Sequence, residues 1–351
     1  MFPFARVRRA VGAKHAPRIG LNRAEFLSRD ASAPSACYPV ARVPSRLSTN
    51  LCGVTLKTPV LAASGTFGYG VELANVVDLS GLGGIVTKGL SRQPMEGNPA
   101  PRLYETASGM LNSVGLQNIG VRAFVRDKLP ALRDAGTQIF ANVFGYSVED
   151  YVEVIQILEN AEGLAGYELN VSCPNTKNGG MFFSHDPKLL SEVVAAARAA
   201  IRSHRPLIVK LSPNVAKIEP LAQVAADSGA DALSLVNTFV GLAIDPHTRT
   251  TRIANGYGGL SGPAIKPIAL RMVYEAARAV KIPVVGLGGI ANGTDTAEFM
   301  IAGATAVQVG TASFWDPQSP LRIANQLETF LAEENISHAN DLVGTLKFPG
   351  K

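Results

Sequence analysis

One cysteine of this sequence lies among residues that suit chemistry better than packing. Cys173 stands in the segment NVSCPNTKNGG, residues 170–180. A cysteine with an ordinary pKa of about 8.5 can supply a thiolate base near neutral pH, especially beside a cation. A lone cysteine is more often a buried core residue, but the flanking asparagines and proline argue against an apolar shell here. We therefore predict that Cys173 is a catalytic base.

Polar residues and glycines also follow other short apolar runs of the chain. They are Ser64-Gly65-Thr66, Lys88-Gly89, Asn142, Asn170, Lys210, Asn237-Thr238, Gly288-Gly289 and Gly310-Thr311. Taken singly, each could be a turn residue or a solvated surface group. A lysine directly after an apolar strand is seldom a surface charge, however, because the strand itself is buried. Taken together, these residues predict a binding site.

Two glycine-containing segments near the C-terminus indicate phosphate binding. Gly288-Gly289 ends one apolar run, and Gly310-Thr311 ends the next. Backbone N–H groups in such loops commonly bind a ligand phosphate, and glycine lets the backbone approach it closely. A tight turn alone would explain the first pair, but the second pair at the matching place favours a phosphate site.

The strands that precede these residues must position them. Eight short, nearly continuous apolar runs alternate with amphipathic helical stretches, as expected of strands covered on both faces. The runs are residues 60–64, 84–88, 138–143, 167–171, 207–211, 232–236, 283–287 and 306–309. Helix starts are predicted by Ser147 with Asp150, which resembles a capping box, and by Asp186 with Pro187. Helix ends are predicted at Gly136, Gly229 and Gly303.

Strand and helix repeated eight times predict an α/β fold, a closed (β/α)8 TIM barrel. Such a barrel gathers its active site at the C-terminal ends of the strands, where the polar residues fall. A short β-hairpin, residues 47–51 and 54–56, is expected to precede the first barrel strand and close the barrel base. We predict one catalytic domain, residues 47–351, after an N-terminal extension, residues 1–46.

The N-terminal extension carries the basic charge of the chain. Residues 1–46 contain nine Lys and Arg against two acids, a net charge of +7, so the formal +5 of the whole chain leaves −2 for residues 47–351. We therefore expect no nucleic-acid binding by the barrel. The extension is interpreted as disordered, with an overlong translation start or an organelle transit peptide as alternatives. Its two acids and the lack of a cleavage pattern disfavour the transit peptide.

Composition also limits the location and the metal content. No run approaches the roughly 18 uninterrupted apolar residues of a membrane span, so we predict no membrane association. The three cysteines, Cys37, Cys52 and Cys173, favour a reducing compartment, and we predict the cytoplasm. Three thiolates cannot hold a [2Fe–2S] cluster of the Cys₄ type. The five histidines show no metal-ligand spacing, and no metal is predicted.

Several motifs occur in an order that a known family shares. They are ASGTFG at residues 63–68, TKG at 87–89, NSVGLQN at 112–118, NVSCPN followed by TKNGG at 170–180, and GLSGPAIKP at 259–267. Together they resemble the class 1 dihydroorotate dehydrogenases, and the resemblance runs from about residue 47 to about residue 335. It implies an enzyme that oxidises dihydroorotate to orotate in de novo pyrimidine biosynthesis.

The resemblance implies FMN as the cofactor, bound at the barrel mouth. The FMN phosphate would lie at Gly288, Gly289, Gly310 and Thr311. The other matching positions implied to contact FMN are Ser64, Lys88, Gly89, Asn142, Asn170, Lys210, Val236 and Gly262. Among these, Lys210 suits the electron-rich N1/C2 edge of the flavin.

The resemblance also implies a site for dihydroorotate, a cyclic ureide with a carboxylate. Amide side chains suit the ureide because they donate and accept hydrogen bonds at once. The expected contacts to the ureide are Asn112, Asn170, Asn175, Asn237 and Thr238. Lys88 and the backbone N–H groups of Asn112, Ser113, Val114, Gly115 and Leu116 would hold the carboxylate. In the implied reaction the Cys173 thiolate removes the C5 proton while hydride passes from C6 to the flavin.

A cysteine rather than a serine as the base makes the sequence more similar to class 1 enzymes than to the quinone-linked membrane group. The KNGG that follows NVSCPNT is closer to class 1B than to the fumarate-using class 1A. Class 1B implies a homodimer core joined by a subunit with FAD and a [2Fe–2S] cluster, a heterotetramer that passes electrons to NAD. The alternatives are a class 1A enzyme, a dihydropyrimidine dehydrogenase-like flavoprotein, a dihydrouridine synthase and a non-catalytic FMN- or phosphate-binding barrel.

Overall fold

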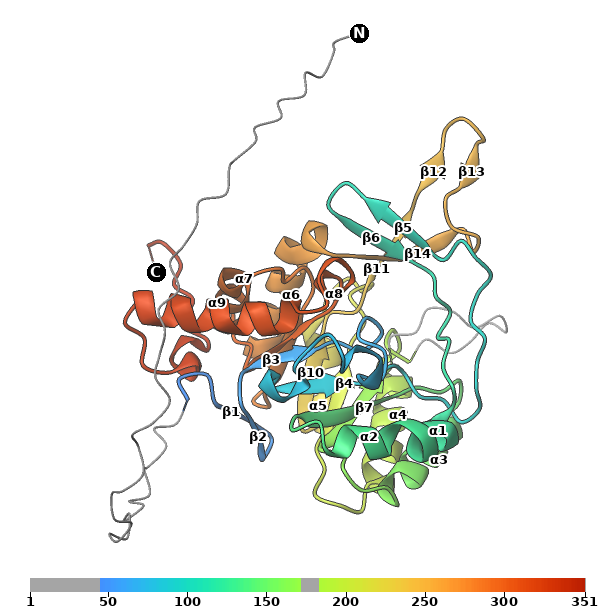
Figure 1. The fold of residues 1–351 in the computed structure, drawn as a ribbon, viewed down its shortest axis with the longest axis horizontal. Coiled ribbons are helices and arrows are strands. Elements are labelled where there is room, and N and C mark those ends of the chain that lie inside the picture. The colour runs from blue at the N-terminus through green and yellow to red at the C-terminus, as the bar shows by residue number, and fades with distance from the viewer. Residues whose placement is uncertain (1–44, 172–182, 351) are drawn as a thin grey trace, which may run out of the picture. The chain divides into compact units, whose positions relative to one another are not determined.

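A closed barrel of parallel strands forms the centre of the molecule, which is described by a computed structural model over residues 45–171 and 183–350 (Figure 1). The strands follow one another around the barrel in chain order, and β16 pairs with β3 to close it. The barrel strands are β3 (Val60–Ala62), β4 (Gly84–Val86), β7 (Gln138–Val143), β8 (Gly166–Asn170), β9 (Leu207–Lys210), β10 (Ala232–Leu235), β15 (Val284–Leu287) and β16 (Ala306–Val309). All eight apolar runs of the sequence therefore lie in the barrel, and the predicted TIM barrel is confirmed.

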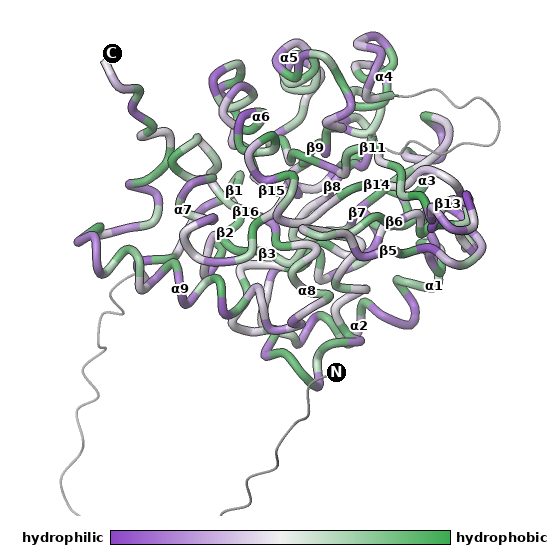
Figure 2. Tube along the Cα trace, turned by 90° about the horizontal axis from the view of Figure 1, so that it is seen from above, coloured by the Kyte–Doolittle hydropathy of each residue, from purple (hydrophilic) through white to green (hydrophobic). Residues whose placement is uncertain are grey.

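Helices connect the barrel strands and pack outside them. They are α1 (Val121–Ala123), a π-helical turn (Phe124–Lys128), α2 (Leu129–Arg133), α3 (Val148–Glu159), α4 (Pro187–Ala200), α5 (Glu219–Asp227), α6 (Lys266–Ala279), α7 (Gly293–Ile301), α8 (Ala312–Trp315) and α9 (Ser319–Glu333). Short 3₁₀ turns cover Val71–Leu73, Leu79–Gly81, Pro263–Ile265 and Ala339–Leu342. Hydrophobic and hydrophilic residues alternate along α9 (Figure 2), as expected of a helix with one buried face.

The predicted helix boundaries at Ser147, Asp186, Gly229 and Gly303 are confirmed, whereas α2 ends at Arg133, three residues before Gly136. Ser147 caps α3 by accepting from the backbone N–H of Asp150 at 3.3 Å, and Asp186 caps α4 through two backbone N–H groups. The reciprocal bond of a capping box goes elsewhere, because the Asp150 carboxylate accepts from Tyr146 N at 3.1 Å. Gly229 and Gly303 follow α5 and α7 with φ of 106° and 119°, which a residue with a Cβ rarely adopts.

A β-hairpin closes the base of the barrel, as the sequence predicts. Strands β1 (Thr49–Leu51) and β2 (Val54–Leu56) pair antiparallel. Leu51 and Leu56 are fully buried, in one cluster with Leu61, Phe140 and other residues of the barrel strands. Burial of side chains of this size stabilises a fold by about 1.5–3 kcal/mol each. The barrel base is thus an apolar plug.

A second sheet stands at the C-terminal end of the barrel, and the sequence did not predict it. Its strands are β5 (Leu103–Thr106), β6 (Gly109–Asn112), β11 (Phe239–Leu242) and β14 (Tyr257–Ser261), in the order β11-β14-β6-β5. A further hairpin, β12 (Ile244–Asp245) with β13 (Thr250–Thr251), projects beyond it (Figure 1). The pairing of β14 with β6 sets Gly259 opposite Asn112, so two distant segments meet above the barrel.

No helix within the described ranges has the length and apolar character needed to cross a membrane.

Candidate active site

A cavity of about 450 Å³ lies between the strand ends and the second sheet. Its volume is within the range of about 300–1,000 Å³ that is usual for small-molecule sites. Every predicted site residue that the structure describes lines it: Ser64, Lys88, Gly89, Asn112, Ser113, Val114, Gly115, Leu116, Asn142, Asn170, Lys210, Val236, Asn237, Thr238, Gly262, Gly288, Gly289, Gly310 and Thr311. The predictions for Cys173 and Asn175 lie outside the described residues.

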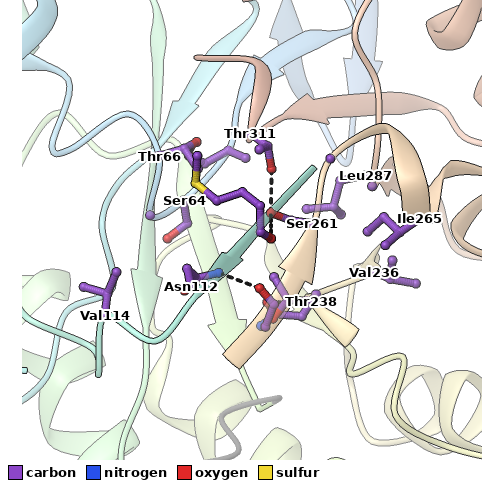
Figure 3. A pocket seen from close by; sticks show the side chains of 18 of the residues that line it. Ser64, Thr66, Asn112, Val114, Val236, Thr238, Ser261, Ile265, Leu287 and Thr311 are labelled. Carbon is purple, nitrogen blue, oxygen red and sulfur yellow. Dashed lines mark hydrogen bonds between the residues drawn. The ribbon is translucent and has the colours of Figure 1, made fainter. Parts of the chain in front are cut away.

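The rim of the cavity is held by hydrogen bonds from the second sheet and its loops. The Asn112 amide donates to the carbonyl of Gly259 at 3.2 Å, and Asn98 donates to both oxygens of Ser113, at 2.9 and 3.1 Å. Thr311 Oγ1 donates to Ser261 Oγ at 2.8 Å in the cavity wall (Figure 3). These bonds place the segment 112–116 over the barrel, opposite the glycine loops.

The two glycine loops have the form of an anion cradle. Gly289 has φ of 85°, and a Cβ built there would meet the backbone O of Gly262 at 2.9 Å. A Cβ at Gly310, in contrast, would have no described atom closer than 3.6 Å. Among the described residues, the backbone N–H groups of Gly289, Gly310 and Thr311 form no hydrogen bond. Unpaired N–H groups in the wall of a cavity are what a phosphate requires.

Two amides and a hydroxyl lie together on another wall of the cavity. The Asn237 side chain donates to Asn170 Oδ1 at 3.5 Å and accepts from the backbone N–H of Thr238 at 2.8 Å. Groups of this kind can both donate and accept. The arrangement could pair with a ring that has alternating N–H and C=O groups.

Lys88 lines the cavity and carries a partly buried charge. Burial lowers the pKa of its ammonium below the ordinary value of 10.5, and the positive charge of Arg102 lowers it further. Desolvation and a like charge both disfavour the protonated form. A carboxylate bound beside Lys88 would favour the protonated form and raise its pKa again.

A buried carboxylate lies beneath the floor of the cavity, and sequence reasoning missed it. Glu168 is fully buried in β8. It accepts hydrogen bonds from Asn142, Ser234 and Gln308, at 2.6–2.9 Å, and lies 3.4 Å from the ammonium of Lys210. The available signal was a charged or amide residue inside four of the eight apolar runs, at Asn142, Glu168, Lys210 and Gln308, since a buried charge needs partners.

Two acceptor atoms of the floor have no partner. Asn142 Oδ1 and Gln308 Oε1 are buried and form no hydrogen bond within the described part of the chain, although both residues line the cavity. Buried polar atoms are nearly always paired, and an exception points to a missing ligand or water. The floor therefore fits a ligand that carries N–H or O–H groups.

A family model described as dihydroorotate dehydrogenase matches residues 46–331. The chain belongs to the dihydroorotate dehydrogenase family. Its members are oxidoreductases that convert dihydroorotate to orotate, a step of pyrimidine biosynthesis, and the family is flavin-dependent in general. The resemblance seen in the sequence is thus confirmed at the level of the family.

Individual dihydroorotate dehydrogenases are similar over nearly their whole length. The chain is 69% identical over 303 residues to a putative dihydroorotate dehydrogenase A (fumarate) from Solibacter usitatus, covering 86% of this chain and 99% of the relative. It is 53% identical over 301 residues to the dihydroorotate dehydrogenase B (NAD(+)) catalytic subunit of Geobacter sulfurreducens, covering 86% and 98%. A ligand-free DHODH structure from Eimeria tenella shares the fold, with a TM-score of 0.74 at 22% identity, covering 88% and 94%.

Proposed function

We propose that this dihydroorotate dehydrogenase binds FMN in the cavity and uses Cys173 as the base. The observation that carries the proposal is the chemistry of the cavity wall: unpaired N–H groups at Gly289, Gly310 and Thr311, with the unpaired acceptors of Asn142 and Gln308 at the floor. The first set suits a phosphate and the second suits the N–H and hydroxyl groups of a flavin nucleotide. Bound FMN would supply the acceptor for the hydride that leaves C6 of dihydroorotate.

The proposed roles divide between the cofactor and the substrate. Toward FMN we assign Ser64, Lys88, Gly89, Asn142, Asn170, Lys210, Val236, Gly262, Gly288, Gly289, Gly310 and Thr311. Toward dihydroorotate we assign Lys88, Asn112, Ser113, Val114, Gly115, Leu116, Asn170, Asn175, Asn237 and Thr238. Lys88 binds the carboxylate, and the amides orient the ureide ring. With the ring held, the Cys173 thiolate removes the C5 proton.

We propose further that the electrons leave through a partner subunit to NAD, as in a class 1B enzyme. The names of the Geobacter relatives, catalytic subunits of an NAD(+) enzyme, support this acceptor. Three cysteines in the chain cannot hold a Cys₄ cluster, so an FAD and [2Fe–2S] subunit would have to be separate. In this proposal the catalytic chain forms a homodimer core within a heterotetramer. The cytoplasmic location stays a prediction.

Exposed apolar side chains on the second sheet support an assembly. Val240, Leu242 and Tyr257 are between 47% and 63% exposed, although they lie on β11 and β14, two paired strands of that sheet. A gathered apolar surface of this kind is typical of a protein–protein contact.

A fumarate-using class 1A enzyme is the second candidate. It is favoured by one observation, the name of the Solibacter usitatus relative at 69% identity. Fumarate would need no partner chain, because a small dicarboxylate could enter the same cavity. The two candidates therefore differ in what the isolated chain can do.

Anaerobic flavin spectroscopy on the purified chain tests both the proposed cofactor and the proposed electron acceptor. We expect a yellow protein with one FMN per chain, whose absorption is bleached by dihydroorotate. Colourless protein that takes up no added FMN would contradict the cofactor proposal. After bleaching, NAD should restore the colour slowly unless the partner subunit is added. Rapid recovery with fumarate would assign class 1A, and rapid recovery with NAD alone would contradict the two-subunit arrangement.

A further inference from the structure

The side chains that form the floor of the cavity converge on one carboxylate, Glu168, which has no role in the proposed reaction. Glu168 Oε1 accepts from Asn142 Nδ2 at 2.7 Å and lies 3.4 Å from Lys210 Nζ. Its Oε2 accepts from Gln308 Nε2 at 2.6 Å and from Ser234 Oγ at 2.9 Å. Four other barrel strands, β7, β9, β10 and β16, thus reach this residue of β8.

This carboxylate decides which way the two amides point. An ionised carboxylate can only accept hydrogen bonds, so Asn142 and Gln308 must each offer it their NH₂ group. The carbonyl oxygen of each amide is then turned away from Glu168. Both residues are 1% exposed, both line the cavity, and both oxygens are without a partner in the described structure. The floor consequently offers the ligand two acceptors.

Glu168 also balances the charge of Lys210. Both side chains are almost completely buried, with exposed fractions of 0% and 6%. A buried charge without a counter-charge is strongly unfavourable. The pair keeps the floor neutral while the Lys210 ammonium, which can donate three hydrogen bonds, still lines the cavity. The floor therefore combines one cation with two acceptors and no net charge.

The pattern matches a flavin better than it matches the substrate carboxylate. The oxidised pyrimidine edge of a flavin has acceptors at N1, O2 and O4 and a single N–H at N3, and the ribityl chain adds hydroxyl donors. Two acceptors and a cation can pair with such a set. A carboxylate would be repelled by the two carbonyl oxygens. The floor thus suits the cofactor, while the rim is left for the substrate.

We propose that Glu168 is the positioning residue of the flavin site: it turns the Asn142 and Gln308 oxygens toward the N–H and hydroxyl groups of FMN and holds the Lys210 charge in balance. The proposal rests on the proposed binding of FMN. It assigns Gln308 as a further cofactor contact. Glu168 itself touches no ligand and acts through the three side chains above it.

Glu168→Gln, which conserves volume, is the decisive variant. Glutamine carries an NH₂ group in place of one oxygen, so at least one amide must turn its own NH₂ away and lose its acceptor orientation. The positive charge of Lys210 also loses its counter-charge, and this favours the more negative, reduced form of the cofactor. We expect FMN to bind at least tenfold more weakly in its oxidised form. The midpoint potential should rise by about 30 mV or more, the equivalent of a tenfold preference for a two-electron couple.

The chain offers a matched control in Glu159→Gln. Glu159 is also a buried carboxylate with several donors, and its side chain is 2% exposed. It lies at the end of α3, outside the barrel, and does not line the cavity. This variant should lower the unfolding temperature but leave the FMN dissociation constant and the midpoint potential of the holoenzyme unchanged. The same shift in both variants would show a merely structural effect and overturn the proposal.

Gln308→Met provides a test that leaves the buried charges in place, for use in particular when Glu168→Gln does not fold. It removes one acceptor from the floor, and we expect FMN to bind about fivefold more weakly, the effect of one neutral hydrogen bond. Wild-type FMN affinity in folded Gln308→Met, or wild-type affinity and potential in folded Glu168→Gln, would overturn the inference. Failure of the wild-type chain to bind FMN would instead remove the proposed function on which the inference rests.

Discussion

The hydroxyl of Tyr167 donates a 2.7 Å hydrogen bond to Glu159 Oε1 and so ties β8 to the end of α3. The same carboxylate accepts from the hydroxyl of Ser203 at 2.8 Å and from the backbone N–H groups of Arg202 and Ser203, both at 2.8 Å. Burial alone would raise the pKa of Glu159, but these hydrogen bonds outweigh it and lower the pKa to about 2. The next residue of the strand, Glu168, faces the barrel interior.

Glu159 is therefore expected to stabilise the fold in a pH-dependent way. Its pKa falls from 4.5 in the unfolded chain to about 2 in the folded one, so its contribution is present above pH 4.5 and is lost as the pH falls toward 2. At about 1.4 kcal/mol per pKa unit, the shift corresponds to roughly 3 kcal/mol. Glu159→Gln should lower the urea midpoint at pH 7, and the difference from wild type should shrink below pH 4.5. A difference that does not depend on pH would contradict this account.

Lys88 should give substrate binding an upper pH limit below that of an ordinary lysine. Burial and then Arg102 lower its pKa from 10.5, so the charged form that binds a carboxylate is lost earlier as the pH rises. Arg102→Gln removes the repulsive charge and should move the loss of orotate affinity to higher pH. The measurement is the orotate dissociation constant against pH by flavin difference spectroscopy. Arg126→Gln, an exposed arginine paired with Asp127, is the control and should not move the profile.

Cys173 stays a prediction from the sequence, and its substitution tests the chemistry directly. Cys173→Ala should retain FMN but lower turnover by about 10²–10⁴-fold, the usual contribution of a general base. Cys173→Ser should keep part of the activity, with its optimum at higher pH because a hydroxyl is a weaker acid than a thiol. Steady-state rates with dihydroorotate across pH give both results. Normal turnover by the alanine variant would remove Cys173 from the mechanism.

Gly310→Ala separates ligand binding from folding. A Cβ at this position would meet Ala63 Cβ at 3.6 Å and nothing nearer among the described atoms, so the protein itself can accept the methyl group. Bound phosphate needs that space if our assignment is right. We expect the unfolding temperature of the FMN-free protein to be unchanged and FMN affinity to fall about tenfold or more. Unchanged affinity would place the phosphate away from this loop.

Removal of residues 1–40 should leave the flavin content and the oxidation of dihydroorotate as they are. The family match begins only at residue 46, and the strong basic charge lies before it. The comparison requires FMN content and turnover of the truncated and full-length chains. Loss of yellow protein after truncation would show that the extension belongs to the catalytic domain.

Much of this architecture could be predicted because buried parallel strands have a strong local signature. The apolar runs marked all eight barrel strands, and the polar residues after them marked the cavity. Glu168, Ser234 and Gln308 were missed because each lies inside an apolar run, and only the closed barrel shows that they meet. The second sheet was missed for another reason. Gly259 and Asn112 pair across 147 residues, and no local pattern records such a pairing.

The apolar plug formed by the β1–β2 hairpin has a consequence for the order in which molecules arrive. With Leu51 and Leu56 buried in the barrel base, a ligand of the floor must enter by the same mouth as the substrate. A cofactor on Asn142, Lys210 and Gln308 would then sit beneath whatever occupies the rim at Asn112. The cofactor must then bind before the substrate and can leave only after it. Orotate bound at the rim would therefore slow the dissociation of the flavin.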